Sequence, residues 1–215
     1  MEIDPQFLAG RMSIRPPQLA TLGAYQIGVI TGEMAAGIAA AAEIFQFRFA
    51  DATRLALITK VSLMGFNVSV TGFTAGIGHL SMQMARAWTA NGTGGANPTL
   101  TTNNVNLRTD MPATLISSGS TAGDIRIATT AALTAGTKTL DAAFVGRQIV
   151  NFNTTAQQQM LPSEVPLFNW VDNNYHPIIL EADEGFSILV TVPATGTWDA
   201  AIKVCWQEVS ASDWA

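Results

Sequence analysis

Apolar and polar residues alternate along several stretches of this chain, a pattern typical of β-strands with one buried face. The clearest short example is residues 44–49, where Phe45, Phe47 and Phe49 alternate with Gln46 and Arg48. We therefore expect a half-buried strand here. Its three rings would lie on one face and its polar side chains on the other.

A longer alternating stretch changes face partway. Leu55, Leu57, Val61 and Leu63 share one parity, and Met64, Phe66, Val68 and Val70 share the other. The change falls at Gly65, and a glycine inside a strand often marks a β-bulge or bend. We expect a strand that is re-aimed at this position.

A third stretch carries Leu80, Met82, Met84 and Trp88 in one parity. This predicts another strand. Because Leu80, Met84 and Trp88 are also four residues apart, a helix remains the alternative.

The C-terminal quarter shows the same alternation twice. Phe186, Ile188, Val190 and Val192 form the first set, and Ile202, Val204 and Trp206 form the second. The residues between them, 193–197, read Pro-Ala-Thr-Gly-Thr, which favours a turn. We predict a β-hairpin with the Cys205 side chain on the face opposite Trp206.

Short polar residues separate these stretches. Residues 91–98, 117–123 and 151–155 are rich in Asn, Gly, Ser and Thr and are predicted to be loops. Residues 31–42 have helix-favouring residues and a capping Thr31, but Gly32 and Gly37 weaken a helix, so helix and non-helical structure both stay open there.

Composition limits the class of protein. Of 215 residues, 48% are hydrophobic and 13% charged, which excludes intrinsic disorder for the body of the chain. Eleven basic against 16 acidic residues, with only three lysines, do not suit a protein that binds nucleic acid through its phosphates. The longest small apolar run, residues 34–42, is far shorter than the roughly 20 residues that span a bilayer, so we expect no membrane-spanning helix.

Domain organisation is predicted to be simple, because no internal repeat or charged linker divides the chain. We expect one β-sandwich domain over residues 18–215. Residues 1–17 contain Pro5, Pro16 and Pro17 and are predicted to form an extended N-terminal arm that reaches a neighbouring subunit. Met12 is a possible natural start, in which case residues 1–11 are an added extension. No secretory signal is evident at the N-terminus.

Candidate catalytic residues are few. His79 and His176 are the only histidines, and neither lies in a catalytic spacing such as H-E-x-x-H. The single cysteine, Cys205, forbids an intrachain disulfide and is interpreted as a packing residue. We therefore expect no catalytic, cofactor-binding or metal-binding residues, and no enzymatic activity.

Three further segments are candidates for ligand binding. The acidic run 181–185 is interpreted as a hairpin turn closed by Gly185, with a calcium site as the weaker alternative. The glycines of 72–78 lack the spacing and the lysine of a phosphate-binding loop. Residues 91–109, rich in Asn, Thr and Gly, would form an ordinary surface loop or, alternatively, a surface that contacts sugars.

Assembly is suggested by the aromatic content. Five tryptophans and ten phenylalanines stand among few charges, and strand edges poor in lysine tend to aggregate unless they are paired or buried. We expect an obligate homo-oligomer.

Several segments carry a resemblance to a known group of proteins. They are Met34–Ile38, Glu43–Phe49, Thr53–Leu57, Gly72–Gly76, Leu107–Thr109, Ala135–Asp141, and Glu184–Phe186 continuing through Pro193–Trp198. Over about residues 14–209 the chain resembles virion-associated structural proteins of tailed bacteriophages and prophages. The resemblance implies a β-sandwich component of the phage particle, and it assigns no functional residues.

These observations together predict an all-β fold, an antiparallel, jelly-roll-like β-sandwich with an extended N-terminal arm. The expected function is that of a non-enzymatic capsid decoration protein of the virion, assembled in the host cytoplasm. Its expected partners are further copies of itself, most plausibly in a trimer, and other virion proteins such as the major capsid protein, with no nucleic acid, membrane or cofactor. The alternative is a carbohydrate-binding adhesin module of a phage fibre or tail.

Overall fold

The computed structural model describes residues 23–35, 37–38, 40–68, 76–116, 123–152 and 164–213. The predicted N-terminal arm, residues 1–17, lies outside the described residues. The strands are β1 (Gly23–Ile30), β2 (Ala42–Phe49), β3 (Arg54–Val68), β4 (Gly76–Ala90), β5 (Gly123–Ile127), β6 (Thr137–Phe152), β7 (Val165–Asn169), β8 (Ile178–Leu180), β9 (Glu184–Thr191) and β10 (Trp198–Ser210). Within these residues the only helical elements are α2 (Thr102–Val105) and a 3₁₀ turn over Ala211–Asp213.

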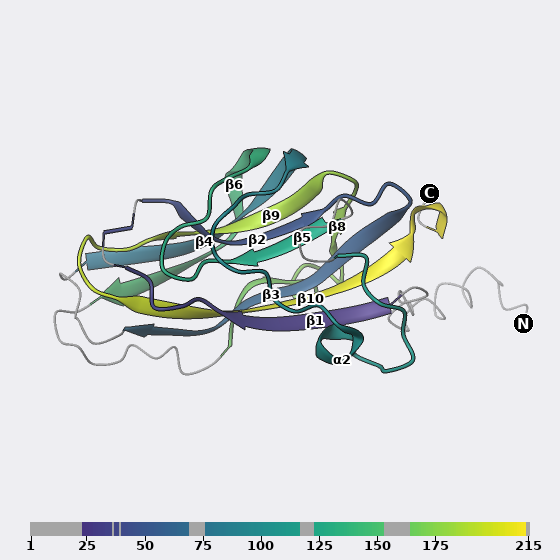
Figure 1. Ribbon diagram of the computed structural model, residues 1–215, viewed down its shortest axis with the longest axis horizontal. Helices are drawn as coiled ribbons and strands as arrows, with labels where there is room; N and C mark the ends of the chain where they lie inside the picture. The colour runs from purple at the N-terminus through teal and green to yellow at the C-terminus, as the bar shows by residue number, and fades with distance from the viewer. Residues whose placement is uncertain are drawn as a thin grey trace, which may run out of the picture.

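Two antiparallel sheets of five strands each pack face to face (Figure 1). The first sheet has the order β1-β10-β3-β7, with β8 also paired to β3, and the second has the order β5-β2-β9-β4-β6. At both ends of the chain, consecutive strands alternate between the sheets, so that β1 lies beside β10 and β2 beside β9. This connectivity is that of a jelly roll with β5 added next to β2. The prediction of an all-β antiparallel sandwich is confirmed.

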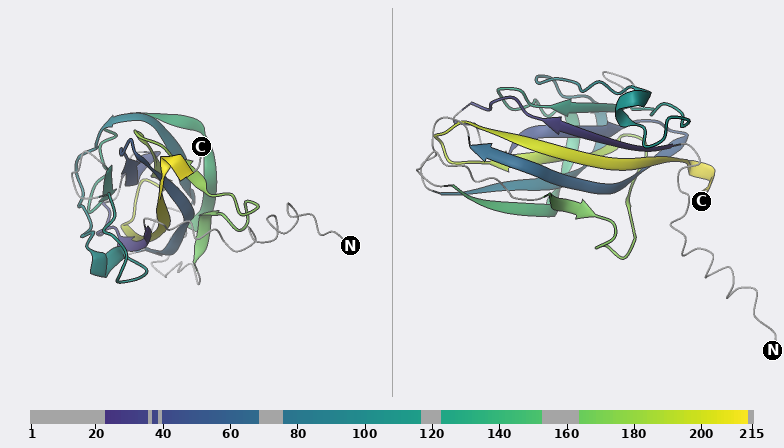
Figure 2. Two further views of the ribbon diagram at one scale, coloured as in Figure 1. Left: turned by 90° about the vertical axis from the view of Figure 1, so that its right-hand side faces the viewer. Right: turned by 90° about the horizontal axis from the view of Figure 1, so that it is seen from below.

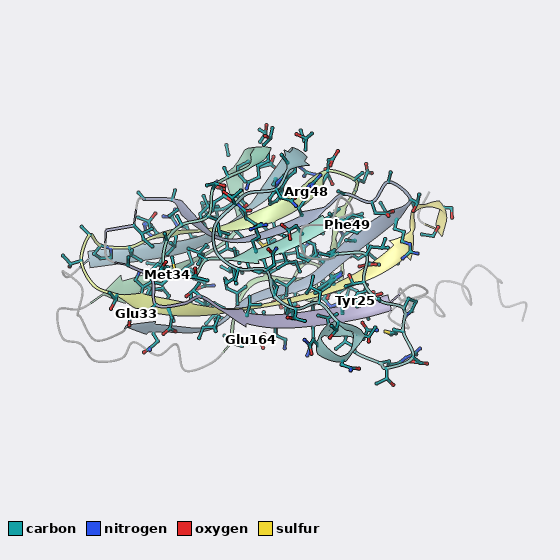
Figure 3. The ribbon with its side chains drawn as sticks, in the orientation of Figure 1. Tyr25, Glu33, Met34, Arg48, Phe49 and Glu164 are labelled. Atoms are coloured by element: carbon teal, nitrogen blue, oxygen red, sulfur yellow. The ribbon has the colours of Figure 1, made fainter. Side chains whose placement is uncertain are left out.

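The core between the sheets is dominated by aromatic rings. Phe47 stacks on Phe186 with ring centroids 5.1 Å apart, and its ring meets Trp206 of the opposite sheet edge-on at 5.5 Å. Trp206 in turn stacks on Tyr25 at 5.4 Å. The end-on view shows the sheets curling around this core (Figure 2). Tyr25 and Phe49, both fully buried, lie among the side chains that fill it (Figure 3).

The prediction of a half-buried strand at residues 44–49 is wrong in one respect. The strand is present as β2 and its phenylalanines face the core, but its opposite face is buried as well. Gln46 is 2% exposed and Arg48 8%. Two loops cover this outer face, and they form the polar network described below.

The predicted irregularity at Gly65 is confirmed in β3. Ala201 and Ile202 of β10 are partners of Gly65 and Leu63, so Met64 is the extra residue of a bulge. A second bulge, at Thr59, was not predicted. It reverses the faces of the first half of the strand, so Leu57 packs in a small separate cluster with Val209 instead of in the main core.

The third alternating stretch is a strand, β4, and the helix alternative is wrong. Leu80, Met82 and Met84 face the core as predicted. Trp88 does not join them, because the chain turns through a left-handed residue at Ala87 (φ 49°). Its ring instead lies 4.1 Å from the Lys138 ammonium group on the outer side of the second sheet.

The predicted C-terminal hairpin is also wrong, although both of its strands exist. β9 lies between β2 and β4 in the second sheet, whereas β10 lies between β1 and β3 in the first. The turn at 193–197 therefore carries the chain across the core from one sheet to the other. The two apolar faces oppose each other across the sandwich instead of lying side by side.

Residues 31–42 contain no helix among those described. Thr31 does not act as a helix cap, since its backbone N–H donates to Ala200 O and its hydroxyl oxygen accepts from Ala200 N. Met34 N donates to Trp198 O at 2.7 Å, so the segment pairs with β10. A Cβ at Gly32 would lie 2.1 Å from Thr129 O, which explains the glycine there.

The predicted loops have mixed outcomes. Residues 91–98 form a loop with one isolated bridge. Residues 151–152 belong to the end of β6, so that loop begins later than predicted, and residues 153–155 lie outside the described residues. Residues 117–122 lie outside them too, and Gly123 already begins β5.

Candidate functional site

The two histidines are not brought together in a shared site. His79 lies in β4 of the second sheet, half-buried, opposite Ile149 of β6. His176 lies in the turn between β7 and β8 of the first sheet, where its Nδ1 is 2.8 Å from Pro177 O.

Cys205 lies on the outer face of the first sheet, between Gln26 of β1 and Lys60 of β3. Its side chain points away from the buried Trp206, as predicted. Burial raises the pKa of the thiol, and the nearby lysines, Lys203 and Lys60, only partly offset this effect. The thiol is therefore less readily ionised than a free cysteine.

The acidic run forms a turn between β8 and β9, with Glu184 N donating to Glu181 O. The prediction of a hairpin turn is wrong, because β8 lies in the first sheet and β9 in the second. Gly185 does not close the turn. Gly185 already lies in β9, where a Cβ would come within 2.1 Å of Phe47 O and 2.9 Å of the Trp88 ring. The carboxylates of this turn pair with arginines, Asp183 with Arg48 at 3.0 Å and Glu184 with Arg86.

Among the described residues, no group of three or more His, Cys, Asp or Glu side chains is placed to hold a metal ion. Residues 72–78 were predicted not to form a phosphate-binding loop. Residues 72–75 lie outside the described residues, and residues 76–78 begin β4. No helix in the described part of the chain is both long and apolar enough to cross a bilayer.

A buried ion pair anchors the outer face of the second sheet. Lys138 Nζ lies 2.6 Å from Glu43 Oε2, and the two side chains are 1% and 8% exposed. The same carboxylate oxygen accepts from Gln46 Nε2 at 2.6 Å and Ser187 Oγ at 3.0 Å. Burial lowers the pKa of Lys138, and its bond to Glu43 only partly offsets this. The carboxylate and the ammonium group thus hold β2, β6 and β9 together where water is excluded.

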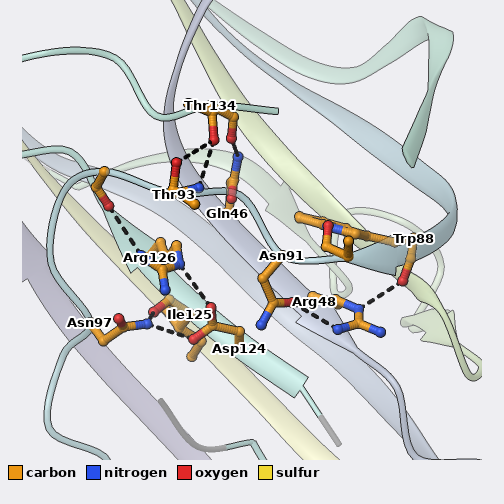
Figure 4. A network of polar contacts seen from close by, with 12 residues as sticks. Gln46, Arg48, Trp88, Asn91, Thr93, Asn97, Asp124, Ile125, Arg126 and Thr134 are labelled. Atoms are coloured by element: carbon orange, nitrogen blue, oxygen red, sulfur yellow. Dashed lines mark hydrogen bonds and ion pairs between the residues drawn. The ribbon is translucent and has the colours of Figure 1, made fainter. Parts of the chain in front are cut away.

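The Asn- and Thr-rich loop is bound into this face (Figure 4). Arg48 donates to Trp88 O at 2.7 Å and to Asn91 Oδ1 at 2.8 Å. Asn97 Nδ2 donates to Asp124 Oδ1 at 2.6 Å and to Ile125 O at 2.9 Å. The side-chain groups of Asn91 and Asn97 that make these bonds are therefore used inside the molecule.

The same loop also closes one sheet edge. β5 is the outer strand on that side, and Ala96 exchanges two backbone hydrogen bonds with Ile127, at 2.8 and 3.0 Å. The beginning of the β1 edge is covered in a similar way, because Leu107 N donates to Ala24 O at 3.0 Å beside the Tyr25–Asn106 bridge. The chain's own loops therefore pair with part of the β5 edge and with the first residues of the β1 edge.

The opposite edge of the second sheet is different. Within the described residues β6 pairs only with β4. β7 crosses β6 near one point, where Gly146 approaches Leu167 and Gln148 Nε2 donates to Pro166 O at 3.0 Å. The described structure shows no loop backbone paired along β6, in contrast to β5 and β1.

Large apolar side chains are exposed at this edge. Leu80 and Met82 face the core, so their neighbours in β4 face outward, and so do the partners of those neighbours in β6. The outward-facing residues Ile77, Phe144 and Ile149 are 61%, 50% and 63% exposed. The Arg147 guanidinium lies 5.4 Å from the Phe144 ring. We name Ile77, Phe144, Arg147 and Ile149 the β4–β6 surface.

Sequence reasoning anticipated exposed edges but did not locate them, because β6 was not predicted as a strand. The residues of β6 do not alternate between apolar and polar, and most of its described side chains are exposed or half-buried. Comparison of the chain with protein-family models, with curated proteins and with solved structures gave no match.

Proposed function

We propose that this chain is a non-enzymatic structural protein of a tailed-phage virion, a capsid decoration protein that acts as a symmetric homo-oligomer. The observation that carries the proposal is the β4–β6 surface, where three large apolar side chains are exposed beside a sheet edge that, among the described residues, is paired on one side only. Exposed apolar patches at an unsealed edge favour contact with another protein.

The contrast between edges supports this choice of surface. The β5 edge and the beginning of the β1 edge carry backbone hydrogen bonds to loop residues, so another chain cannot add a strand at those positions without displacing them. At β6 a partner can bury Phe144 and Ile149 at about 25 cal/mol per Å² of apolar area removed from water. Repeated over a symmetric assembly, such burial would stabilise a capsid shell mechanically and would need no catalytic activity.

The hydrogen-bond partners of the buried polar residues fit a structural role. Glu43 and Lys138 bind each other, and Arg48 donates to Trp88 O of β4 and to Asn91 Oδ1 of the covering loop. These side chains, which are of the kinds that active sites use, thus fix the covering loops to the sheet.

The proposal is tested by imaging phage particles that carry a tagged copy of this chain. Negative-stain electron microscopy with a gold label on the tag is expected to show label at symmetric positions on the head. Label confined to the tail, or particles without label while the tagged chain remains unassembled, would contradict a capsid decoration role.

A further inference from the structure

Three buried side chains on the outer face of the second sheet have the chemistry needed to form an amide bond. They are the amine of Lys138 in β6, and the carboxamide of Gln46 and the carboxylate of Glu43, both in β2. All three side chains are almost completely shielded from water. We infer that Lys138 and Gln46 join in a covalent amide bond, an intramolecular isopeptide cross-link whose formation Glu43 assists. This inference does not depend on the proposed virion role.

The carboxylate holds the two reacting groups close together. Glu43 Oε2 accepts from Lys138 Nζ and from Gln46 Nε2, each at 2.6 Å. The two nitrogens are therefore no farther apart than twice this distance, and the amide carbon of Gln46, Cδ, is bonded to one of them. Thr134 O accepts from Nε2 at 2.8 Å (Figure 4), and Ala135 O accepts from Nζ at 2.7 Å. Groups held in this way react within one molecule and need no chance encounter.

Burial prepares Lys138 to act as a nucleophile. An amine attacks a carbonyl carbon only in its neutral form. Burial lowers the pKa of Lys138, although its bond to Glu43 partly offsets this effect. The face of the Trp88 ring covers the amine, with Nζ 4.1 Å from the ring centroid. Such a closed environment keeps water from competing with the amine for the amide carbon.

Gln46 is poorly satisfied as a purely structural residue. Its Oε1 is buried and has no hydrogen-bond donor among the described residues. The backbone of Gly92 lies beside this oxygen, since a Cβ at Gly92 would be 2.5 Å from Oε1. A buried carbonyl group without a donor lowers stability, and native structures retain few of them. Use of the Gln46 amide in a cross-link gives a reason for its place here.

The reaction transfers the acyl group of Gln46 from one nitrogen to another. The Lys138 ammonium group gives one proton to the Glu43 carboxylate, and the lone pair of Nζ attacks Cδ of Gln46. A second proton passes from Nζ through Glu43 to Nε2, the bond between Cδ and Nε2 breaks, and ammonia departs with the first proton as ammonium. No atom is oxidised or reduced. The new bond joins β2 to β6, two strands that are not neighbours in the sheet.

The test is the intact mass of the full purified chain, measured under denaturing conditions. We expect the mass of the parent to fall short of the mass of its sequence by one ammonia molecule. A tryptic digest of the same sample should contain a branched peptide in which side chains 46 and 138 are joined, because trypsin does not cleave after an acylated lysine. Since this peptide is sought in the parent, the test does not depend on how well a variant folds.

Variants separate the roles of the three residues. Lys138→Arg and Gln46→Met each remove one partner, so each variant should have the full mass of its sequence. Glu43→Gln keeps both partners but removes the carboxylate that moves the protons, and the cross-linked fraction should fall by roughly tenfold or more. Lys60→Arg is the matched control. Lys60 also pairs with a glutamate, Glu164 at 2.9 Å, but is partly exposed, and this variant should keep the mass deficit.

Three results would overturn the inference. The first is a parent with the full mass of its sequence, which contains no cross-link. The second is a deficit of one water molecule, which would place the bond between Lys138 and Glu43. The third is a deficit of one ammonia molecule that persists in Lys138→Arg, which would come from another amide, such as that of Asn91 before Gly92.

Discussion

Trp206 and Cys205 are adjacent residues of β10 with opposite surroundings. Trp206 is 1% exposed and packs on Tyr25 and Phe47, whereas Cys205 lies half-buried on the outer face. We expect Trp206→Ala to lower the free energy of unfolding by about 3 to 5 kcal/mol, because it leaves a cavity in the core. Cys205→Ser should cost less than about 1 kcal/mol. Urea denaturation of both variants beside the parent measures the difference, and equal losses would show that the sulfur has a role in the fold.

Glu208 is a fully buried carboxylate at the end of the same strand. It accepts from Leu115 N at 3.1 Å, from Trp206 Nε1 at 3.3 Å and from the Thr114 hydroxyl. Burial nevertheless raises the pKa of Glu208 above its ordinary value of 4.5, and the donors only partly offset this. The folded state therefore binds the proton of this carboxyl more tightly than the unfolded state does.

This raised pKa predicts a pH dependence with a definite sign. The stabilising contribution of the protonated Glu208 is fully present below about pH 4.5 and is lost as the pH rises through the folded-state pKa. Because glutamine does not titrate, the stability of the parent relative to Glu208→Gln should fall as the pH rises from about 4.5 through the folded-state pKa of Glu208. Urea denaturation of both proteins across that range tests this. A constant difference, or one that grows with pH, would show that the donors outweigh burial.

Among the elements, β6 and β7 come closest where Gly146 of β6 approaches Leu167 of β7, and this approach depends on the glycine. A Cβ at Gly146 would lie 1.7 Å from the carbonyl oxygen of Leu167, which is backbone and cannot rotate away. We expect Gly146→Ala to lower the free energy of unfolding by about 1 to 3 kcal/mol through overpacking.

Gly65 supplies the matched control for this substitution. It also lies within a strand, β3, but nothing stands within 4 Å of a Cβ there. Gly65→Ala should be neutral or stabilise by up to about 1 kcal/mol. Thermal and chemical denaturation of the two variants compare them directly. Similar losses in both would mean that strand glycines matter here for backbone freedom and not for the β6–β7 contact.

The strands were predictable from the sequence where one face is apolar and the other polar. Alternation located β2, β3, β4, β9 and β10, because burial of one face imposes a period of two residues. It could not show which strands pair, so β9 and β10 were predicted as a hairpin although they lie in opposite sheets. Alternation reports the direction of side chains, whereas pairing depends on contacts between residues far apart in the chain.

The sequence predicted that exposed sheet edges and polar loops exist, but not where they lie or what they contact. The composition indicated that sheet edges must be covered, and the sequence pattern located the polar loops. It did not indicate that these loops cover the outer face of the second sheet. Gln46 and Arg48 were expected at the solvent-exposed face because glutamine and arginine are usually exposed. Loop residues cover them: Asn91 Oδ1 accepts from the Arg48 guanidinium and Thr134 O accepts from Gln46 Nε2. No local sequence pattern indicates such partners.

On the scale of the whole molecule, the described residues leave the β6 edge without paired loop backbone and beside exposed apolar side chains. Loop backbone pairs with part of the β5 edge and with the beginning of the β1 edge, and the β4–β6 surface presents Ile77, Phe144 and Ile149 to solvent. An assembly that buries this surface removes the exposed patch and the open edge together. The proposed virion role requires such an assembly in solution or on the particle.

Light scattering of the purified chain, coupled to size exclusion, tests this claim most directly. We expect a homo-oligomer, a trimer of the 22.8 kDa chain, and we expect Phe144→Ser combined with Ile149→Ser to yield monomers. Ile30→Ser combined with Met64→Ser, which removes two exposed apolar side chains from the outer face of the other sheet, should leave the mass unchanged. A parent that is monomeric at micromolar concentration, or one whose assembly is lost only in the Ile30 and Met64 variant, would contradict this claim.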